Sequence, residues 1–198
     1  MSPGYVQKVR KEKGLQSYKV PLVPNRSDKQ NTTAKYRSQK LYDNIVHNFD
    51  CIIMDDETYV KADFKQIPGQ VYYTAKKKGD VAPKFKEKKV DKFAKRYLVW
   101  QAICKCGLKS SVFVYSGTIN QNVYVEECLQ KRLLPMLRLH KVSVLFWPDL
   151  ATCHYGKLTM EWYKENGVNI VPKNANPPNC PELWPIENYW AIMKRKWI

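Results

Sequence analysis

Apolar residues recur along this chain in two patterns, helical spacing and short continuous runs. Between residues 41 and 49 they recur at helical spacing, which predicts a helix leading into the core. Residues 51–60 begin with an apolar run and predict a strand. Residues 97–104 and 111–115 predict two further strands, and Gly107 between them marks the turn of a hairpin.

The same two patterns alternate in the second half of the chain. Residues 121–139 carry apolar side chains at helical spacing, and Pro135 within them predicts a kink. Residues 142–147 are apolar apart from Ser143, which is typical of a strand buried on both faces. A further helix is predicted at 158–166, with Gly167 at its end.

The last third of the chain ends in a helix that follows a long loop. Residues 168–171 predict a short strand, and 174–185 are rich in Pro and Asn, as in a loop. The last helix is predicted from Pro185 to the end of the chain, because Pro is well tolerated in a first turn. Hairpin strands first and strand–helix units afterwards predict an α/β fold with a mixed sheet covered by helices.

The first 40 residues lack such apolar clusters. Residues 4–14 predict a short helix that stops at Gly14. Pro21 and Pro24 then interrupt regular structure, and residues 25–40 are interpreted as a polar linker.

Composition adds a prediction about partners. The chain has 198 residues, of which 44% are hydrophobic, enough for a sizeable core. Its formal net charge of +16 indicates a polyanionic partner, above all nucleic acid. A basic protein that is only soluble, or one bound to structural RNA, remains the alternative. No apolar run is long enough to span a bilayer and no signal-peptide core opens the chain, so no membrane association is expected.

The six cysteines are scattered and contain no CxxC pair. Cys104 and Cys106 form the one close pair, and on alternate positions of a strand they would share a face. A metal site there would need partners from elsewhere in the chain. Reduced thiols inside a cell are the simpler interpretation.

Three acidic residues stand where predicted elements end or begin. Asp56 lies on or just after the first strand, Asp149 follows the buried strand, and Glu187 opens the last helix. If the two strands are neighbours, Asp56 and Asp149 can share a metal ion, and a helix packed across that edge could bring Glu187 within reach. Such hard oxygen ligands suit Mg²⁺ or Mn²⁺. The plainer alternatives are a turn residue, a helix cap and a dipole-complementing Glu.

The sequences around these acids resemble the three acidic motifs of mariner-type transposases, in the Tc/mariner superfamily of DDE transposases. They are MDDETYV at 54–60, FWPDLATCHYGK at 146–157 and NPPNCPELWPIENYWAIMKRK at 176–196. QIPGQVYYTA at 66–75 also resembles the stretch after the first acid, and the likeness extends over residues 50–198. The resemblance implies an RNase H-like mixed sheet, with antiparallel strands first and parallel strands after them, flanked by helices.

The resemblance also implies which acids are catalytic. It selects Asp56 instead of Asp55, then Asp149, and finally Glu187 instead of Glu182, as the catalytic residues and the ligands of two Mg²⁺ or Mn²⁺ ions. The interval between the second and third acids is longer than in many family members, and many of those have Asp as the third acid.

Two positions near the second acid depart from the family pattern, and a third matches it. Many relatives have Asn where this chain has Leu150, and Pro where it has Thr152. His154 matches a His common in the family. It is either a buried structural histidine or a residue with a role near the metal site.

The implied activity is cut-and-paste DNA transposition, in which one site cleaves DNA strands and then transfers them, so DNA integration is expected. The expected partners are transposon inverted-repeat ends, target DNA and a second copy in a homodimer, in the nucleus. Residues 1–40 are interpreted as the end of a helix-turn-helix region with a basic linker, and 41–198 as the catalytic domain. The chain resembles a fragment truncated at both ends, so weak catalysis is expected.

A basic loop at about 63–95 is interpreted as a clamp that contacts DNA or a second subunit, or else as a solvated charged loop. The candidate DNA contacts are basic residues of this loop and of the last helix. They are Lys76, Lys77, Lys78, Lys84, Lys86, Lys88, Lys89, Lys194, Arg195 and Lys196.

Two other functions stay open beside an active transposase domain. One is a catalytically inactive DNA-binding remnant, which the missing base-reading units favour. The other is a basic RNA-binding structural protein, against which the three acids argue. DNA binding is expected to be strong, sensitive to salt and poorly sequence-specific, because phosphate contacts carry no direct sequence information.

Overall fold

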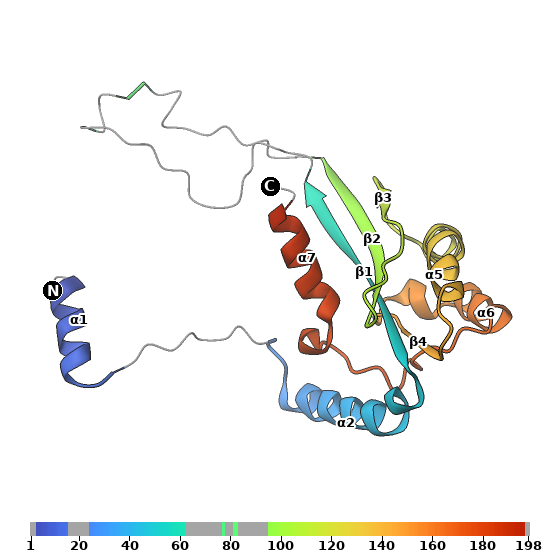
Figure 1. Cartoon of the computed structure of the whole chain (residues 1–198), viewed down its shortest axis with the longest axis horizontal. Coiled ribbons are helices and arrows are strands. Elements are labelled where there is room, and N and C mark those ends of the chain that lie inside the picture. Colours follow the sequence, from blue (N-terminus) through green and yellow to red (C-terminus); the bar gives the residue numbers. More distant parts are fainter. Residues whose placement is uncertain (1–2, 16–23, 62–76, 78–80, 83–94, 197–198) are drawn as a thin grey trace.

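A mixed four-stranded sheet forms the centre of the computed structural model (Figure 1). The structure describes residues 3–15, 24–61, 77, 81–82 and 95–196. The strands are β1 (Cys51–Lys61), β2 (Arg96–Cys104), β3 (Phe113–Tyr115) and β4 (Val144–Trp147), in the order β3-β2-β1-β4. β1 pairs antiparallel with β2 and parallel with β4, which confirms the mixed sheet predicted from the sequence.

Neighbouring residues of the central strands point to opposite faces and build two separate cores. Ile53 and Phe146 pack into one cluster, and Met54 and Trp147 into the other. This alternation follows from the two-residue period of a strand. Both faces of the sheet are therefore buried, in keeping with the continuously apolar run that predicted β4.

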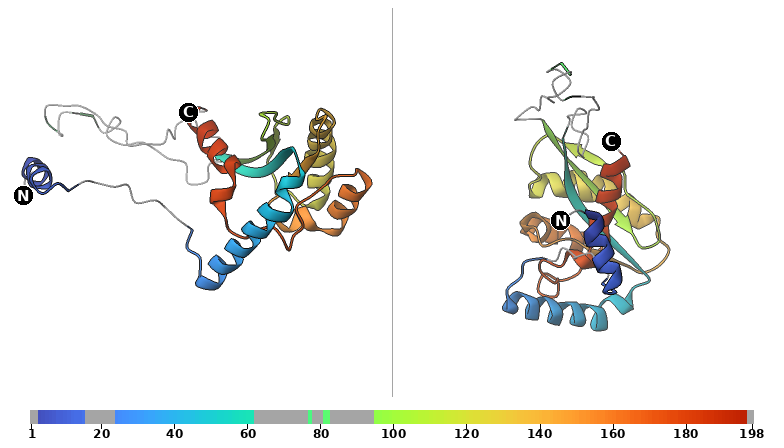
Figure 2. Two further views of the ribbon diagram at one scale, coloured as in Figure 1. Left: turned by 60° about the horizontal axis from the view of Figure 1, so that its bottom comes forward. Right: turned by 90° about the vertical axis from the view of Figure 1, so that its left-hand side faces the viewer.

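Helices cover both faces (Figures 1 and 2). The first face carries the helical stretch α4 (Gln121–Val123), η3 (Tyr124–Leu133) and α5 (Leu134–Arg138), together with α6 (Lys157–Glu165). α7 (Pro185–Lys196) and the end of α2 (Asp28–Asn44) pack on the second face. Short 3-10 turns complete the domain at η1 (Val46–Asn48), η4 (Thr152–Tyr155) and η5 (Pro181–Leu183).

The interpretation of residues 25–40 as a polar linker is wrong, because α2 occupies most of them. Ser27 and Gln30 form a reciprocal capping box that satisfies the first free N–H groups of this helix. Arg37 then donates a hydrogen bond of 3.1 Å to the carbonyl of Asn176, in the long loop before α7. Good caps and tertiary contacts thus hold a helix whose composition is polar, and the boundary predicted at residue 40 falls inside it.

Two other elements differ from the sequence prediction. The strand predicted at 168–171 is a single parallel bridge between Ile170 and Phe146. The helix predicted at 121–139 is present, but its middle has π-type hydrogen bonding, in which the Leu134 N–H donates to the carbonyl of Leu129. Pro135 begins the next α-helical turn, where its missing N–H costs little.

The N-terminal helix is confirmed as α1 (Pro3–Glu12), followed by Gly14 at φ 63°, a value that suits glycine. It stands apart from the sheet in Figure 1 and in the left-hand view of Figure 2. The stretch 66–75 and nearly all of the basic loop lie outside the described residues. Within the part of the chain that is described, no helix is both long and apolar enough to cross a bilayer.

Candidate metal centre

Two adjacent carboxylates on β1 have opposite environments. The Asp55 side chain is fully buried, and its Oδ2 accepts hydrogen bonds from Trp100 Nε1 at 2.9 Å and Tyr124 Oη at 2.6 Å. Asp56 points to the other face, where it lines a cavity of about 80 Å³ with Asp149 and Glu187. The strand period therefore separates a carboxylate held in the core from one that faces a cavity.

The parallel pairing of β1 and β4 brings the second acid to the first. Met54 pairs with Trp147, so the chain leaves β4 beside the middle of β1 and Asp149 follows two residues later. One carboxylate oxygen each from Asp56, Glu57 and Asp149 lies within 4.8 Å of the others. This compact group contains two of the three predicted acids and adds Glu57.

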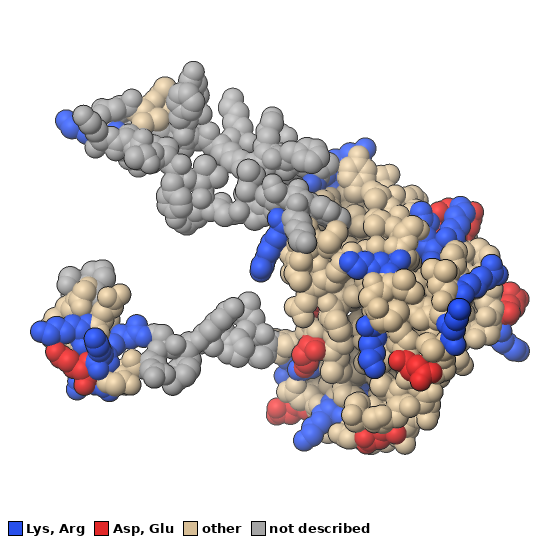
Figure 3. Space-filling model, in the orientation of Figure 1, with Lys and Arg blue, Asp and Glu red and all other residues tan. Residues whose placement is uncertain are grey.

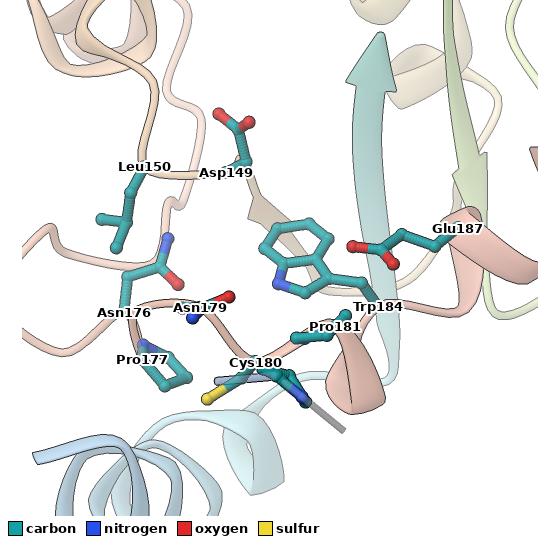
Figure 4. Close-up of a pocket in the computed structure, with 10 residues that line it drawn as sticks. Asp149, Leu150, Asn176, Pro177, Asn179, Cys180, Pro181, Trp184 and Glu187 are labelled. Carbon is teal, nitrogen blue, oxygen red and sulfur yellow. The ribbon is translucent and has the colours of Figure 1, made fainter. Parts of the chain in front are cut away.

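Glu187 reaches the same cavity from the first turn of α7. Its backbone N–H donates to the carbonyl of Trp184 at 3.0 Å, which fixes the start of the helix. In Figure 4 the carboxylates of Asp149 and Glu187 lie on either side of the Trp184 indole. The structure thus places all three predicted acids around one cavity, with Glu187 outside the compact group of oxygens.

His154 is fully buried between two of the carboxylates. Its Nδ1 lies 2.5 Å from Asp149 Oδ1, and its Nε2 lies 3.5 Å from Glu57 Oε1. Burial alone would lower the pKa of His154, but the charge of Asp55 and the contact with Asp149 outweigh it and raise that pKa well above its ordinary value. Each interpretation of His154 is therefore partly right: it is buried, and it also contacts carboxylates of the candidate site.

Crowding of negative charge makes this centre suited to a cation. Burial, reinforced by the charges of Glu57 and Asp149, raises the pKa of Asp56 to about 7. Burial likewise raises the pKa of Asp55 to about 6 and, together with the charge of Glu182, raises that of Glu187. Burial acts upward on Asp149 too, yet contact with His154 leaves its pKa lowered. Hard oxygen donors with uncompensated charge beside an open cavity fit a divalent ion such as Mg²⁺ or Mn²⁺.

A larger groove of about 680 Å³ continues from Asp149 and Glu187 along the Pro- and Asn-rich loop (Figure 4). Asn176 anchors this loop beside the site. Its Nδ2 donates to the Pro148 carbonyl at 2.8 Å and to Tyr155 Oη at 2.9 Å, and its Oδ1 accepts from Trp147 Nε1 at 2.9 Å. The bond to Pro148 holds the backbone directly before Asp149, and the other two bonds hold the side chains of Trp147 and Tyr155.

Few of the candidate DNA contacts belong to the described residues. Lys77 is exposed, as are Lys194 and Arg195 near the end of α7. Lys196 ends that helix, but its side chain is outside the described part, as are the other loop lysines. On the face in Figure 3, basic side chains are spread among acidic ones and form no single patch over the described elements.

Sequence reasoning missed Glu57 and Asn176. Glu57 was visible as an acid next to Asp56, but on an ideal strand it points to the opposite face, so no pattern assigned it to the site. Asn176 lay inside the third motif, although nothing in its spacing announced three buried hydrogen bonds.

Comparison with known proteins adds a family to this geometry. Residues 52–198 match the family model described as DDE superfamily endonuclease. No curated protein matches the chain in sequence.

Three solved structures show the same fold. The Mos1 transposase paired-end complex with left transposon end is 17% identical, with a TM-score of 0.60 over 98% of this chain and 56% of that one. The Mos1 strand transfer complex is 16% identical, with a TM-score of 0.62 over 99% and 56%. The catalytic domain of Mos1 mariner transposase is 15% identical, with a TM-score of 0.50 over 89% and 75%. The RNase H-like fold is thus confirmed, and the chain spans under two thirds of the first two structures.

Proposed function

This chain belongs to the DDE superfamily of endonucleases, and on that basis we propose that it cleaves and transfers DNA strands in cut-and-paste transposition. The observation that carries the proposal is the gathering of Asp56, Asp149 and Glu187 around one cavity. All three belong to the motifs that resemble mariner-type transposases, and the cavity opens beside a groove along the loop before α7.

Asp56, Asp149 and Glu187 are the proposed ligands of two Mg²⁺ or Mn²⁺ ions. The Mos1 mariner transposase has been solved in paired-end complexes with Mn and with Mg, which supports this choice of ion. When bound, such a pair of ions activates the attacking oxygen and stabilises the leaving one. Glu57 lies close to Asp56 and Asp149, whereas Glu187 lies outside their compact group. Glu57 is therefore a further candidate ligand.

The chain's own residues orient these ligands. His154 lies between Asp149 and Glu57, and the contact of its Nδ1 with Asp149 Oδ1 fixes the direction of the Asp149 carboxylate. The Ala151 N–H donates to the same Asp149 Oδ1 at 2.8 Å, so two contacts hold that oxygen in place. Asn176 holds the preceding backbone, and together these contacts pre-organise the centre before DNA arrives.

The proposed partners are transposon ends, target DNA and a second copy of the chain in a homodimer, and the proposed location is the nucleus. The net charge of +16 supports a DNA partner through neutralisation of phosphates. Complexes of Mos1 with a transposon end and in strand transfer support the same type of substrate.

A second candidate function is a DNA-binding remnant without catalysis. Two observations favour it over full activity. Glu187 lies outside the compact group of carboxylate oxygens. Leu150 stands next to Asp149 where many relatives have a polar Asn.

Nicking of supercoiled plasmid in Mg²⁺ or Mn²⁺ tests the proposal. We expect nicking by the unaltered chain and loss of it in Asp149→Asn. Glu161→Gln on α6, with a half-exposed carboxylate outside the site, is the matched control and should retain nicking. DNA binding without nicking by the unaltered chain would identify the inactive remnant instead. Metal-independent nicking, equal in Asp149→Asn, would contradict both functions.

A further inference from the structure

A second cluster of metal-binding side chains lies at the start of β1. Cys51, Cys104, Cys106 and His140 each offer one ligand atom, and these four atoms all lie within 4.8 Å of one another. Cys106 Sγ is 3.3 Å from His140 Nε2. Three sulfurs and one imidazole nitrogen converging on one point form a donor set typical of structural zinc.

Three different parts of the fold bring these ligands together. Cys51 is the first residue of β1, and Cys104, the last of β2, pairs across from Ile53. Cys106 follows in the hairpin turn, where the Lys105 N–H donates to the Ile52 carbonyl at 3.0 Å. The turn thereby places Cys106 next to the start of β1, on the same side as Cys104.

The turn depends on a glycine. Gly107 has φ of 92°, which is open to glycine and strained for other residues. Its N–H donates to the Cys104 carbonyl at 3.0 Å, and the Cys104 N–H donates to the Leu108 carbonyl at 3.0 Å. These hydrogen bonds fix the backbone at Cys104 and at the turn, so the hairpin itself positions the two sulfurs.

His140, just beyond α5, is oriented by a backbone carbonyl. Its Nδ1 lies 2.9 Å from the Met136 carbonyl, which can only accept a hydrogen bond, so Nδ1 carries the proton. The lone pair is then on Nε2, the atom that faces Cys106. Zinc-bound histidines usually make this kind of contact with their other ring nitrogen.

We propose that Cys51, Cys104, Cys106 and His140 bind one structural Zn²⁺ ion as three thiolates and one imidazole. In a tetrahedral site, ligand atoms about 2.0–2.3 Å from zinc lie about 3.5–3.8 Å from one another, within the spread seen here. Four protein ligands leave no open position, so the ion has a structural role.

The zinc-binding state requires reduced sulfurs. Cys104 and Cys106 are joined as a disulfide in this structure. A dithiol reductant supplies two electrons and two protons to this bond and is itself oxidised to its disulfide. Zn²⁺ then replaces the protons of the three thiols of Cys51, Cys104 and Cys106, and three protons are released as three Zn–S bonds form.

The ion would clip together the start of β1, the end of β2 and the chain that follows α5. Asp56 lies five residues further along β1, about 17 Å away for an extended strand. This site is therefore separate from the carboxylate cluster, and the inference does not depend on the proposed function. A fixed β1–β2 register should stabilise the whole sheet.

The test loads the full chain, reduced and freed of metal by a chelator, with Zn²⁺ or Co²⁺ under anaerobic conditions. We expect one tightly bound Zn²⁺ per chain and a rise in Tm of about 5–10 °C on loading, as a few kcal/mol gives in a domain of this size. Co²⁺ should give the intense visible bands of a tetrahedral site together with a thiolate charge-transfer band.

Matched variants make the test specific. Cys106→Ser, at an exposed position that should not perturb folding, and His140→Asn should each weaken Co²⁺ binding more than tenfold. Cys180→Ser and His47→Asn, outside the cluster, should bind like the unaltered chain, and Asp149→Asn should keep the thiolate band. A reduced, folded chain that takes up no Zn²⁺ would overturn the proposal, as would Co²⁺ bands unchanged in Cys106→Ser.

Discussion

The start and the middle of strand β1 carry different sets of metal-binding atoms. Near its middle, Asp56 and Glu57 join Asp149 as hard oxygen donors beside an open cavity. At its start, Cys51 joins a compact set of sulfur and nitrogen donors from the hairpin and from His140. On the proposals above, one strand would support a centre of oxygen ligands with an open position and a closed centre of sulfur and nitrogen ligands.

Charge explains the difference in physical terms. Burial and, after it, the neighbouring carboxylates Glu57 and Asp149 raise the pKa of Asp56. Such a centre gains from divalent ions and keeps room for a substrate. At the start of β1, the sulfurs of Cys104 and Cys106 are joined as an uncharged disulfide, and they can bind a metal only after reduction.

The largest expected effect distinguishes the carboxylate site from the cysteine–histidine site by DNA-nicking activity. Asp56→Asn should lower metal-dependent nicking more than about a hundredfold, because it removes a ligand, and loss of supporting contacts alone costs about 10–100-fold. Cys106→Ser should leave nicking within about threefold. Asp55→Asn is the comparison on the opposite face of β1. Asn can keep both hydrogen bonds at Oδ2, but the lost charge lowers the pKa of His154, so we expect a smaller loss of nicking than in Asp56→Asn. Equal losses in Asp55→Asn and Asp56→Asn would break the distinction between the two faces of β1.

The next largest effect concerns the Pro- and Asn-rich loop that supports the carboxylate site. Asn176→Ala should lower the free energy of unfolding by about 2–4 kcal/mol, because it leaves the buried Trp147 Nε1–H and Pro148 carbonyl without their hydrogen-bond partners. Urea denaturation measures this loss, with Asn174→Ala, exposed in the same loop, as the control. A change below about 0.5 kcal/mol would mean that Asn176 does not anchor the loop.

A smaller loss is expected in the core beneath β1. Tyr124→Phe removes one of the two donors to Asp55 Oδ2 and should cost about 1–2 kcal/mol of unfolding free energy. Zinc loading should raise the Tm of this variant as much as that of the unaltered chain, because the two sites are separate. If zinc loading no longer raised the Tm of Tyr124→Phe, the two sites would not be independent.

The smallest effect concerns DNA. Arg195→Gln, near the end of α7, should weaken binding only a few-fold and lower the slope of affinity against salt by about 1. Lys164→Gln on α6, across the sheet from α7, is the control. Fluorescence anisotropy at several salt concentrations measures both slopes. An unchanged slope for Arg195→Gln would mean that Arg195 does not contact DNA.

The strands and the last helix could be predicted because each has a local pattern. β1 and β4 are marked by apolar runs, and α7 by Pro185 after a long loop. α2 was missed because a polar composition hides a helix that depends on its cap and on distant partners. The predicted strand at 168–171 is only a bridge to β4. An apolar pattern predicts an extended segment, but it cannot show how many of its residues pair with a neighbouring strand.

The two sites also differ in how far the sequence could predict them. Sequence motifs identified Asp56, Asp149 and Glu187 as one group, and the structure places them on one cavity. The pair Cys104 and Cys106 was noticed, but its partners were not, because Cys51 and His140 are distant in sequence and belong to no motif. Only the pairing of β1 with β2 and the end of α5 reveals them.

Mn²⁺ binding tests the central claim most directly, namely that Asp56, Asp149 and Glu187 hold the catalytic ions. Free Mn²⁺ is followed by electron paramagnetic resonance while the ion is titrated into the metal-free chain, Asp149→Asn and Cys106→Ser. We predict uptake by the unaltered chain and by Cys106→Ser, and an affinity more than about tenfold weaker in Asp149→Asn. Mn²⁺ uptake by Asp149→Asn equal to that of the unaltered chain would contradict the account.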